Sequence, residues 1–225
     1  MRAHFYNEIT MLRNMIAAQA AAVEEVVRQS VEAISRGDAK LAADLIAGDR
    51  LIDLEEINIE EECLKILALH QPVAGDLRYV ITFLKVNSEL ERIGDLAVNI
   101  AERTVDIVTS NPGTEIAADI DFLPMCNEAR SMLTLALNAL IDRNTAEALK
   151  VIRHDDVVDD QFKKSFERLR QLIAAHPVAT DYYLNLLSVF RNLERMADCA
   201  TNIGEDVIYL ESGKIVRHEN LSEVK

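Results

Sequence analysis

The sequence predicts an all-α fold, built as a tandem duplication of two antiparallel three-helix bundles. Composition favours helices, because the 225 residues include only seven Gly, four Pro and no Trp, while 49% are apolar. Turn-forming residues are scarce, and Ala, Leu, Glu and Arg, which favour helices, are abundant. Apolar residues recur with the helical period, and the pattern of the first half returns in the second.

Three long helices are expected in the first half. An apolar stripe that steps by three, four or seven residues marks the first helix, which ends at Gly37. Asp38 is placed to cap a second helix that runs to about residue 69. The segment HQPVAGD, with its Pro and Gly, interrupts the helical pattern at 70–76. A third helix then runs to about residue 110, which completes a first domain over 1–110.

Three more helices are expected in the second half. The segment NPGTEIAADID, at 111–121, carries Asn-Pro-Gly and lacks a helical period, so it is predicted to be a linker. A fourth helix is expected over 122–142, a fifth begins after Asn144, and a sixth ends near Gly213. The second domain therefore covers 122–212, followed by a C-terminal tail at 213–225.

The two halves repeat one another. Residues 79–102 and 182–205 are identical at 11 of 24 aligned positions, and QPVAGD is echoed by HPVATD. Self-similarity at a fixed offset is the signature of internal duplication. Each half is therefore expected to be an antiparallel three-helix bundle with short turns.

Charge and targeting signals exclude several classes of protein. The net charge is −14, and both halves are acidic, so direct binding to nucleic acid or to an anionic membrane is not expected. The sequence contains neither a signal peptide at the start nor an apolar run of membrane-spanning length. Three widely spaced Cys without a CxxC motif suit a reducing compartment, so a cytoplasmic location without membrane insertion is expected.

Acidic residues four apart recur at corresponding places in the two halves. Residues at this spacing share one face of a helix. The stretch LERIGDLAVNIAE carries one such pair and LERMADCATNIGE another, and GDRLID and HDDVVDD carry two more. The four pairs are Glu91 and Asp95, Glu194 and Asp198, Asp49 and Asp53, and Asp155 and Asp159.

The turns place these pairs at matching heights. Residues equidistant from the turn of an antiparallel hairpin lie at one level. In the first half, Asp53 with Glu91 and Asp49 with Asp95 both average to position 72, beside the expected turn. The pairs of the second half likewise average to one point near residue 176. Each half is thus predicted to gather four carboxylates.

Two interpretations of such a cluster remain open from the residues alone. Clustered carboxylates must take up protons, pair with arginines or bind a cation. Oxygen ligands suit hard ions such as Fe³⁺, Mg²⁺, Mn²⁺ or Ca²⁺, with Zn²⁺ less characteristic. The alternative is a salt-bridged patch in which Arg92 and Arg195 neutralise the acids.

The stretches LERIGDLAVNIAE and LERMADCATNIGEDVIYLESGKIVRH resemble the PhoU family of phosphate-uptake regulators. The family pattern E-R-x-x-D-x-x-x-N-I occurs in each half, and the resemblance spans essentially the whole chain. It implies two three-helix bundles side by side, with acidic motifs that bind iron or another metal such as magnesium, manganese or zinc. The metal ligands carried over are Asp49, Asp53, Glu91, Asp95, Asp155, Asp159, Glu194 and Asp198. Ala197 stands where the first half has Gly94, which leaves the geometry of the second site open.

The resemblance also implies a function. Members act as negative regulators of the phosphate-starvation response, link a phosphate ABC transporter to a sensor histidine kinase, and often form homodimers. An enzyme is not expected, because no His has a Glu three residues before it, and no HExxH, Gly-rich phosphate loop or GxSxG motif occurs. The alternatives are a metal-storage or metal-dependent bundle, and a structural bundle without a metal function.

Overall fold

The computed structural model describes residues 2–110 and 120–216, and these residues form helices and turns without a strand. The first half contains α1 (Arg2–Arg36), α2 (Ala39–Gly48), α3 (Arg50–His70) and α4 (Ala74–Ser110). The second half contains α6 (Leu123–Asp142), α7 (Thr145–Ala175), a 3₁₀ turn (Pro177–Ala179) and α8 (Thr180–Ser212). Most of the predicted linker and most of the predicted tail lie outside the described residues.

Helix boundaries follow local chemistry. The Asp38 side chain accepts hydrogen bonds from the first backbone N–H groups of α2, as the sequence predicted. Asn144 caps α7 in the same way, through Ala146 N and Glu147 N. At the far end, α8 stops at Gly213, whose φ of +70° suits a residue without a Cβ. These caps satisfy backbone groups that every helix end leaves without an internal partner.

One predicted helix is divided in two. The sequence indicated a single helix from Asp38 to about residue 69, but α2 ends at Gly48 and α3 begins at Arg50. Asp49 between them keeps helical backbone angles (φ −48°, ψ −45°), and its carbonyl accepts from Ile52 N in a tighter three-residue turn. Because the backbone stays helical through the break, the apolar period carries no sign of it.

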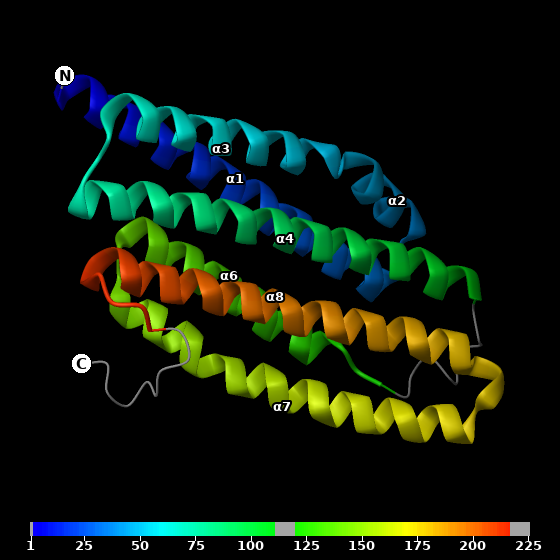
Figure 1. Ribbon diagram of the computed structural model, residues 1–225. Helices are drawn as coiled ribbons and strands as arrows, with labels where there is room; N and C mark the ends of the chain where they lie inside the picture. The colour runs from blue at the N-terminus through cyan, green and yellow to red at the C-terminus, as the bar shows by residue number, and fades with distance from the viewer. Residues whose placement is uncertain (1, 111–119, 217–225) are drawn as a thin grey trace.

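The helices form two antiparallel three-helix bundles that lie side by side (Figure 1). Helix α1, the α2–α3 pair and α4 make the first bundle, and α6, α7 and α8 make the second, with α4 and α8 in contact along the seam between the halves. Buried apolar residues from both halves join in one continuous core. The predicted all-α class and paired three-helix bundles are therefore confirmed.

Polar contacts cross this seam between α4 and α8. The Lys85 ammonium lies 2.9 Å from Oδ1 of Asp206, which is only 2% exposed, and it also lies over the ring of Tyr209. Nearby, the Asn202 amide donates to Glu89 at 3.1 Å. Buried polar contacts of this kind require one alignment of the two helices, so they fix the register between the bundles.

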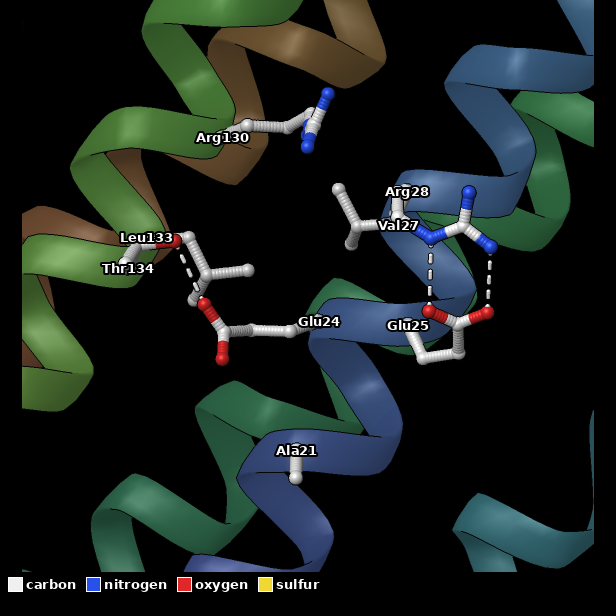
Figure 2. Close-up of a pocket in the computed structure, with 8 residues that line it drawn as sticks. All are labelled: Ala21, Glu24, Glu25, Val27, Arg28, Arg130, Leu133 and Thr134. Atoms are coloured by element: carbon white, nitrogen blue, oxygen red, sulfur yellow. Dashed lines mark hydrogen bonds and ion pairs between the residues drawn. The ribbon is translucent and has the colours of Figure 1, made fainter.

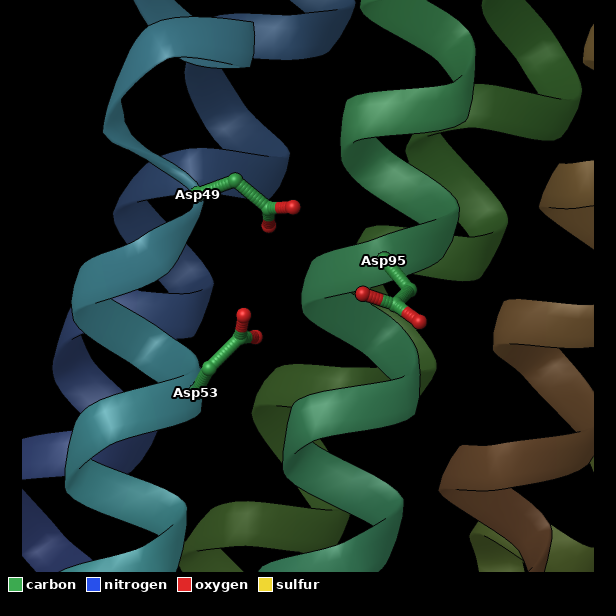
Figure 3. Close-up of side chains that lie close together, drawn as sticks. All are labelled: Asp49, Asp53 and Asp95. Atoms are coloured by element: carbon green, nitrogen blue, oxygen red, sulfur yellow. The ribbon is translucent and has the colours of Figure 1, made fainter.

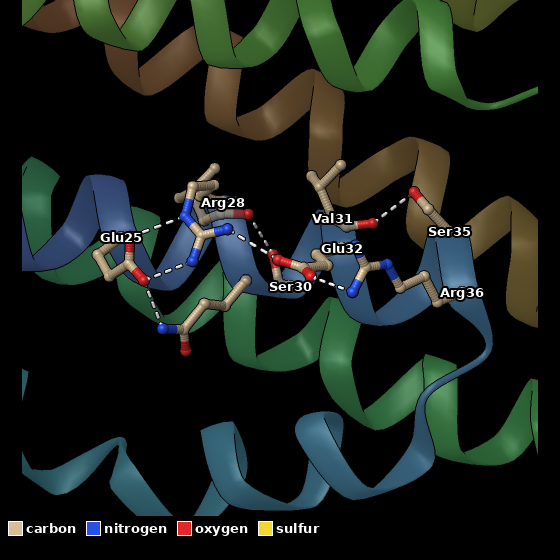
Figure 4. Close-up of polar contacts among 9 residues, drawn as sticks. Glu25, Arg28, Ser30, Val31, Glu32, Ser35 and Arg36 are labelled. Atoms are coloured by element: carbon tan, nitrogen blue, oxygen red, sulfur yellow. Dashed lines mark hydrogen bonds and ion pairs between the residues drawn. The ribbon is translucent and has the colours of Figure 1, made fainter.

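The exposed face of α1 carries a chain of ion pairs instead of apolar contacts. Arg28 binds Glu25 through two nitrogens and reaches Glu32, which in turn pairs with Arg36 (Figure 4). Pairs three and four residues apart support a helix by a few tenths of a kcal/mol each, about 0.2–0.5. No helix in the described parts of the chain meets the length and hydropathy needed to cross a membrane.

Candidate functional site

Acidic side chains of the first half converge between α3 and α4. Asp49 at the α2–α3 junction and Asp53 one turn later both point toward Asp95 on α4 (Figure 3). One carboxylate oxygen from each of the three lies within 4.8 Å of the other two. The predicted meeting of acids at one height is thus observed for these three residues.

A small residue lets α3 and α4 approach at this level. Gly94 directly precedes Asp95, and a Cβ added there would lie 3.0 Å from Cδ1 of Ile52. A contact of this length is tighter than usual, so a larger residue would require the Ile52 side chain to shift by a few tenths of an ångström. The close approach of the backbones brings the acids on α3 within reach of Asp95.

Glu91 completes the predicted set, one turn before Asp95 on α4. Burial first, and then the neighbouring Asp95, Glu56 and Asp53 carboxylates, together raise its pKa from 4.5 to about 7. Burial and neighbouring acids also raise the pKa of Asp49 and of Asp95. Each carboxyl group in this cluster therefore ionises less readily than it would alone, because ionisation would add to the negative charge already gathered there.

One acid of this cluster was not predicted. Glu56 lies three residues after Asp53 on α3, and its pKa is raised by burial, then by Glu60, Asp53 and Asp95. Its backbone carbonyl accepts from the Asn87 amide of α4 at 2.9 Å, which holds the two helices together below the cluster. The duplication gives no signal for it, because Phe162 occupies the corresponding place in the second half. The spacing of three residues from Asp53 was the signal available.

The close arginine–carboxylate pairs that the salt-bridged alternative requires are not formed within the described residues. Across residues 2–110 and 120–216, neither Arg92 nor Arg195 forms an ion pair with any of the eight acids. The single ion pair that the eight acids form joins Asp159 to Lys163 at 3.8 Å. Oδ1 of Asp49 is buried and has no hydrogen-bond partner in the part of the chain that the structure describes. A buried carboxylate oxygen without a partner is uncommon in folded proteins.

The acids of the second half are arranged more loosely. Asp155 and Asp159 lie on α7, and Glu194 and Asp198 on α8. Burial and its neighbours, Asp198 first among them, raise the pKa of Asp155 to about 6. Within the described residues, however, only the first half brings carboxylate oxygens of three acids within 4.8 Å of one another.

Two differences accompany this asymmetry. Ala197 carries a methyl group at the position of Gly94, where a Cβ would be crowded by Ile52 in the first half. The charge also differs, because Arg92 of α4 and Arg195 of α8 both lower the pKa of Asp198, against the effects of burial and of Glu194. The two sites that the sequence presented as equivalent therefore differ in spacing and in electrostatics.

A cation is the partner that fits the first cluster. Its donors are carboxylate oxygens, which suit hard divalent or trivalent ions, and a bound cation would satisfy the orphaned oxygen of Asp49 and offset the mutual repulsion. The groove between α1 and α6, with a volume of ≈320 Å³, is a separate feature that none of the eight acids lines (Figure 2).

The chain is similar in sequence to known proteins over nearly its whole length. A family model described as the PhoU domain matches residues 16–104 and again 122–207. A phosphate-specific transport system accessory protein PhoU homolog of Aquifex aeolicus is 34% identical over 97% of this chain and 97% of its own. The homolog of Pseudomonas aeruginosa is also 34% identical, over 98% of this chain and 90% of its own.

Two solved structures of PhoU proteins have the same fold as this chain. The crystal structure of PhoU from Pseudomonas aeruginosa superimposes with a TM-score of 0.87 at 33% identity, covering 93% of this chain and all (100%) of that one. The phosphate transport system regulatory protein PhoU from Streptococcus pneumoniae gives a TM-score of 0.82 at 26% identity, over 94% of this chain and 99% of its own.

Proposed function

The chain belongs to the PhoU family, and from that membership we propose that it is a negative regulator of phosphate uptake and of phosphate-starvation signalling. Its relatives are named as accessory proteins of phosphate-specific transport. The observation that carries the proposal is the match to the family in both halves, over nearly the whole chain. In this role the protein would lie in the cytoplasm, between a phosphate ABC transporter and a sensor histidine kinase, and catalyse no reaction.

The proposal gives the first acid cluster a metal-binding role. Asp49, Asp53 and Asp95 would hold the ion, and Glu91 stands one turn away on α4 to complete the oxygen set. The ion, whether iron, magnesium, manganese or zinc, supplies positive charge that fixes α3 against α4. The looser acids of the second half, Asp155, Asp159, Glu194 and Asp198, would form a second and weaker site.

Regulation then depends on which state of the surface a partner prefers. A metal that binds one arrangement of α3 and α4 more tightly increases the population of that arrangement, and so does a partner protein that recognises it. Rigid helices with a continuous core suit this role, because they present one defined face. A homodimer, if formed, would present the face twice.

A genetic experiment tests the regulatory proposal. Deletion of the gene should raise expression of a phosphate-starvation reporter in phosphate-rich medium, and the wild-type gene should restore repression. Affinity purification from the same cells should recover transporter or kinase components. Unchanged reporter output in the deletion strain would refute the regulatory role.

Metal content separates the site from the function. Purified protein should retain metal, and the Asp49→Asn, Asp53→Asn, Asp95→Asn triple variant should retain less. Asp44→Asn, which changes an acid on α2 outside the set, is the matched control. Equal metal in wild type and triple variant would show that these acids are not the ligands. Metal retention without any effect on the reporter would favour the metal-storage alternative.

A further inference from the structure

At one end of the molecule, α1 begins, the chain turns from α3 into α4, and α8 ends (Figure 1). Residues from these segments line a second cavity. Its volume is ≈410 Å³, within the range of about 300–1,000 Å³ found for small-molecule sites. Three arginines line it, Arg13, Arg78 and Arg143, against two acids, Asp76 and Glu211. In a chain of net charge −14, a cavity with a positive balance is unusual.

Two of the arginines are held by contacts that reach between the halves. Arg13 of α1 donates from Nη2 to the backbone carbonyl of Ile141 at 2.9 Å, a neutral partner that leaves its charge uncompensated. Arg143, at the end of α6, pairs with Glu211 of α8, and its guanidinium carbon lies 5.9 Å from the centre of the Tyr79 ring. Residues from both bundles therefore fix the positions of these guanidinium groups.

The third arginine, Arg78, lies in the second turn of α4. Its side chain is half-buried, and among residues 2–110 and 120–216 its Nε has no hydrogen-bond partner and is shielded from solvent. The guanidinium lies against the end of α8, where a Cβ added at Gly213 would be 3.4 Å from Nη1. Buried donors in folded proteins are nearly always paired, and Arg78 forms no ion pair within the described ranges, so its charge is left for an anion in the cavity that it lines.

The chemistry of the lining selects the partner. Guanidinium groups bind phosphate oxygens through paired, charge-assisted hydrogen bonds, and they stay protonated at all physiological pH values. Tyr79 adds a neutral hydroxyl donor to the lining, because burial raises its pKa more than Arg13 and Arg143 lower it. Asp76 is exposed at the rim, and Glu211 is already paired with Arg143.

We propose that this cavity binds a phosphate group, either as inorganic phosphate or pyrophosphate or as part of a small phosphate ester. The ligand would contact Arg13 and Arg78 from the first half and Arg143 from the second. Its binding would therefore add a bridge between the bundles. The inference rests on the geometry of this cavity and is independent of the regulatory role proposed above.

Calorimetric titration of the full chain tests the inference. The protein is first treated with chelator, because a metal at the acid cluster would itself attract phosphate. Orthophosphate, pyrophosphate and AMP are titrated separately against a chloride blank of equal ionic strength. We expect at least one of the three to bind with a Kd of about 1 mM or tighter. The anion that binds most tightly identifies the source of the phosphate group.

Variants locate the binding. Arg78→Gln and Arg13→Gln should each weaken binding by about tenfold or more, as expected for loss of a charge-assisted contact. Arg36→Gln removes an exposed arginine that pairs with Glu32 at the other end of α1, and it should bind like wild type. Circular dichroism establishes that each variant is folded. If Arg78→Gln fails to fold, the exposed Arg13→Gln carries the test.

Three results would overturn the inference. None of the three anions binds within that range, or binding survives both Arg13→Gln and Arg78→Gln, or Arg36→Gln weakens binding as much as they do. Binding of AMP alone, lost in the cavity variants, supports the site and assigns it to a phosphate ester. Binding of orthophosphate or pyrophosphate that is lost in the same way assigns it to an inorganic anion.

Discussion

Neutralising one acid of the first cluster should stabilise the metal-free protein, which is the reverse of the usual effect of a substitution. Asp95 has two neighbours, Asp49 and Asp53, with oxygens no more than 4.8 Å from its own. At that separation each neighbour opposes its charge by about 0.9 kcal/mol in a water-like dielectric, and by more where the site is drier. The water-like value is the appropriate one here, because Asp95 as a whole is exposed to solvent, although its carboxylate is partly desolvated.

The expected gain for Asp95→Asn follows from these values. Two neighbours give nearly 2 kcal/mol at low ionic strength, and salt screening lowers the gain to about 1 kcal/mol near physiological ionic strength. Asn and Asp have similar helix propensities, and residue 95 is far from both ends of α4, so little else changes. The free energy of unfolding in chelator at pH 8 should therefore rise by about 1–2 kcal/mol.

Urea denaturation followed by circular dichroism measures the change, with Asp106→Asn as the matched control. Asp106 lies on the same helix but pairs with Arg103 at 2.8 Å, so its loss should be neutral or cost up to about 1 kcal/mol. With Mn²⁺ at about 100 times its Kd, the wild type should gain about 2.7 kcal/mol, and Asp95→Asn should gain less. A lower unfolding free energy for Asp95→Asn in chelator, or an equal metal-induced gain, would refute the electrostatic account.

Three further predictions concern stability. The pKa of Glu91 is raised from 4.5 to about 7, so between these pH values the folded state binds more protons than the unfolded state. The urea midpoint of chelated protein should therefore fall as pH rises from 5 to 8, and Glu91→Gln should flatten the profile. A midpoint that rises with pH would contradict this prediction. Ile59→Ala, at a fully buried position of α3, should lower the unfolding free energy by about 2–5 kcal/mol, whereas Ile57→Ala at an exposed position should change it little. Asn144→Ala removes the cap bonds to Ala146 N and Glu147 N and should cost about 1 kcal/mol in the same assay, with no loss counting against the capping role.

Helix periodicity and capping chemistry were sufficient to predict the fold class and most helix ends. The signals were local, such as Asp38 and Asn144 as caps and Gly213 as the end of α8, and the duplication supplied the pairing of the bundles. The break at Asp49 could not be predicted, because its backbone angles remain helical. The seam could not be predicted either, since contacts such as Lys85 with Asp206 join residues 121 positions apart without any shared pattern.

The candidate site was predictable in part for a similar reason. Equal distance from a turn gives the height of a residue, so Asp49, Asp53 and Asp95 were placed together correctly. Height does not give the separation of two helices, which depends on residues such as Gly94 facing Ile52. The looser spacing of the second half therefore became evident only in three dimensions.

Helix α4 contains both Arg78 of the cavity and Asp95 of the acid cluster, and no break in the helix separates them. The 17 intervening steps span roughly 25 Å at 1.5 Å per residue. An unbroken helix moves largely as a rigid body, so a tilt at one end also displaces the other end. An anion that moved the Arg78 end of α4 would shift Asp95 relative to Asp49 and Asp53. Anion binding in the cavity would then alter the geometry of the acid cluster.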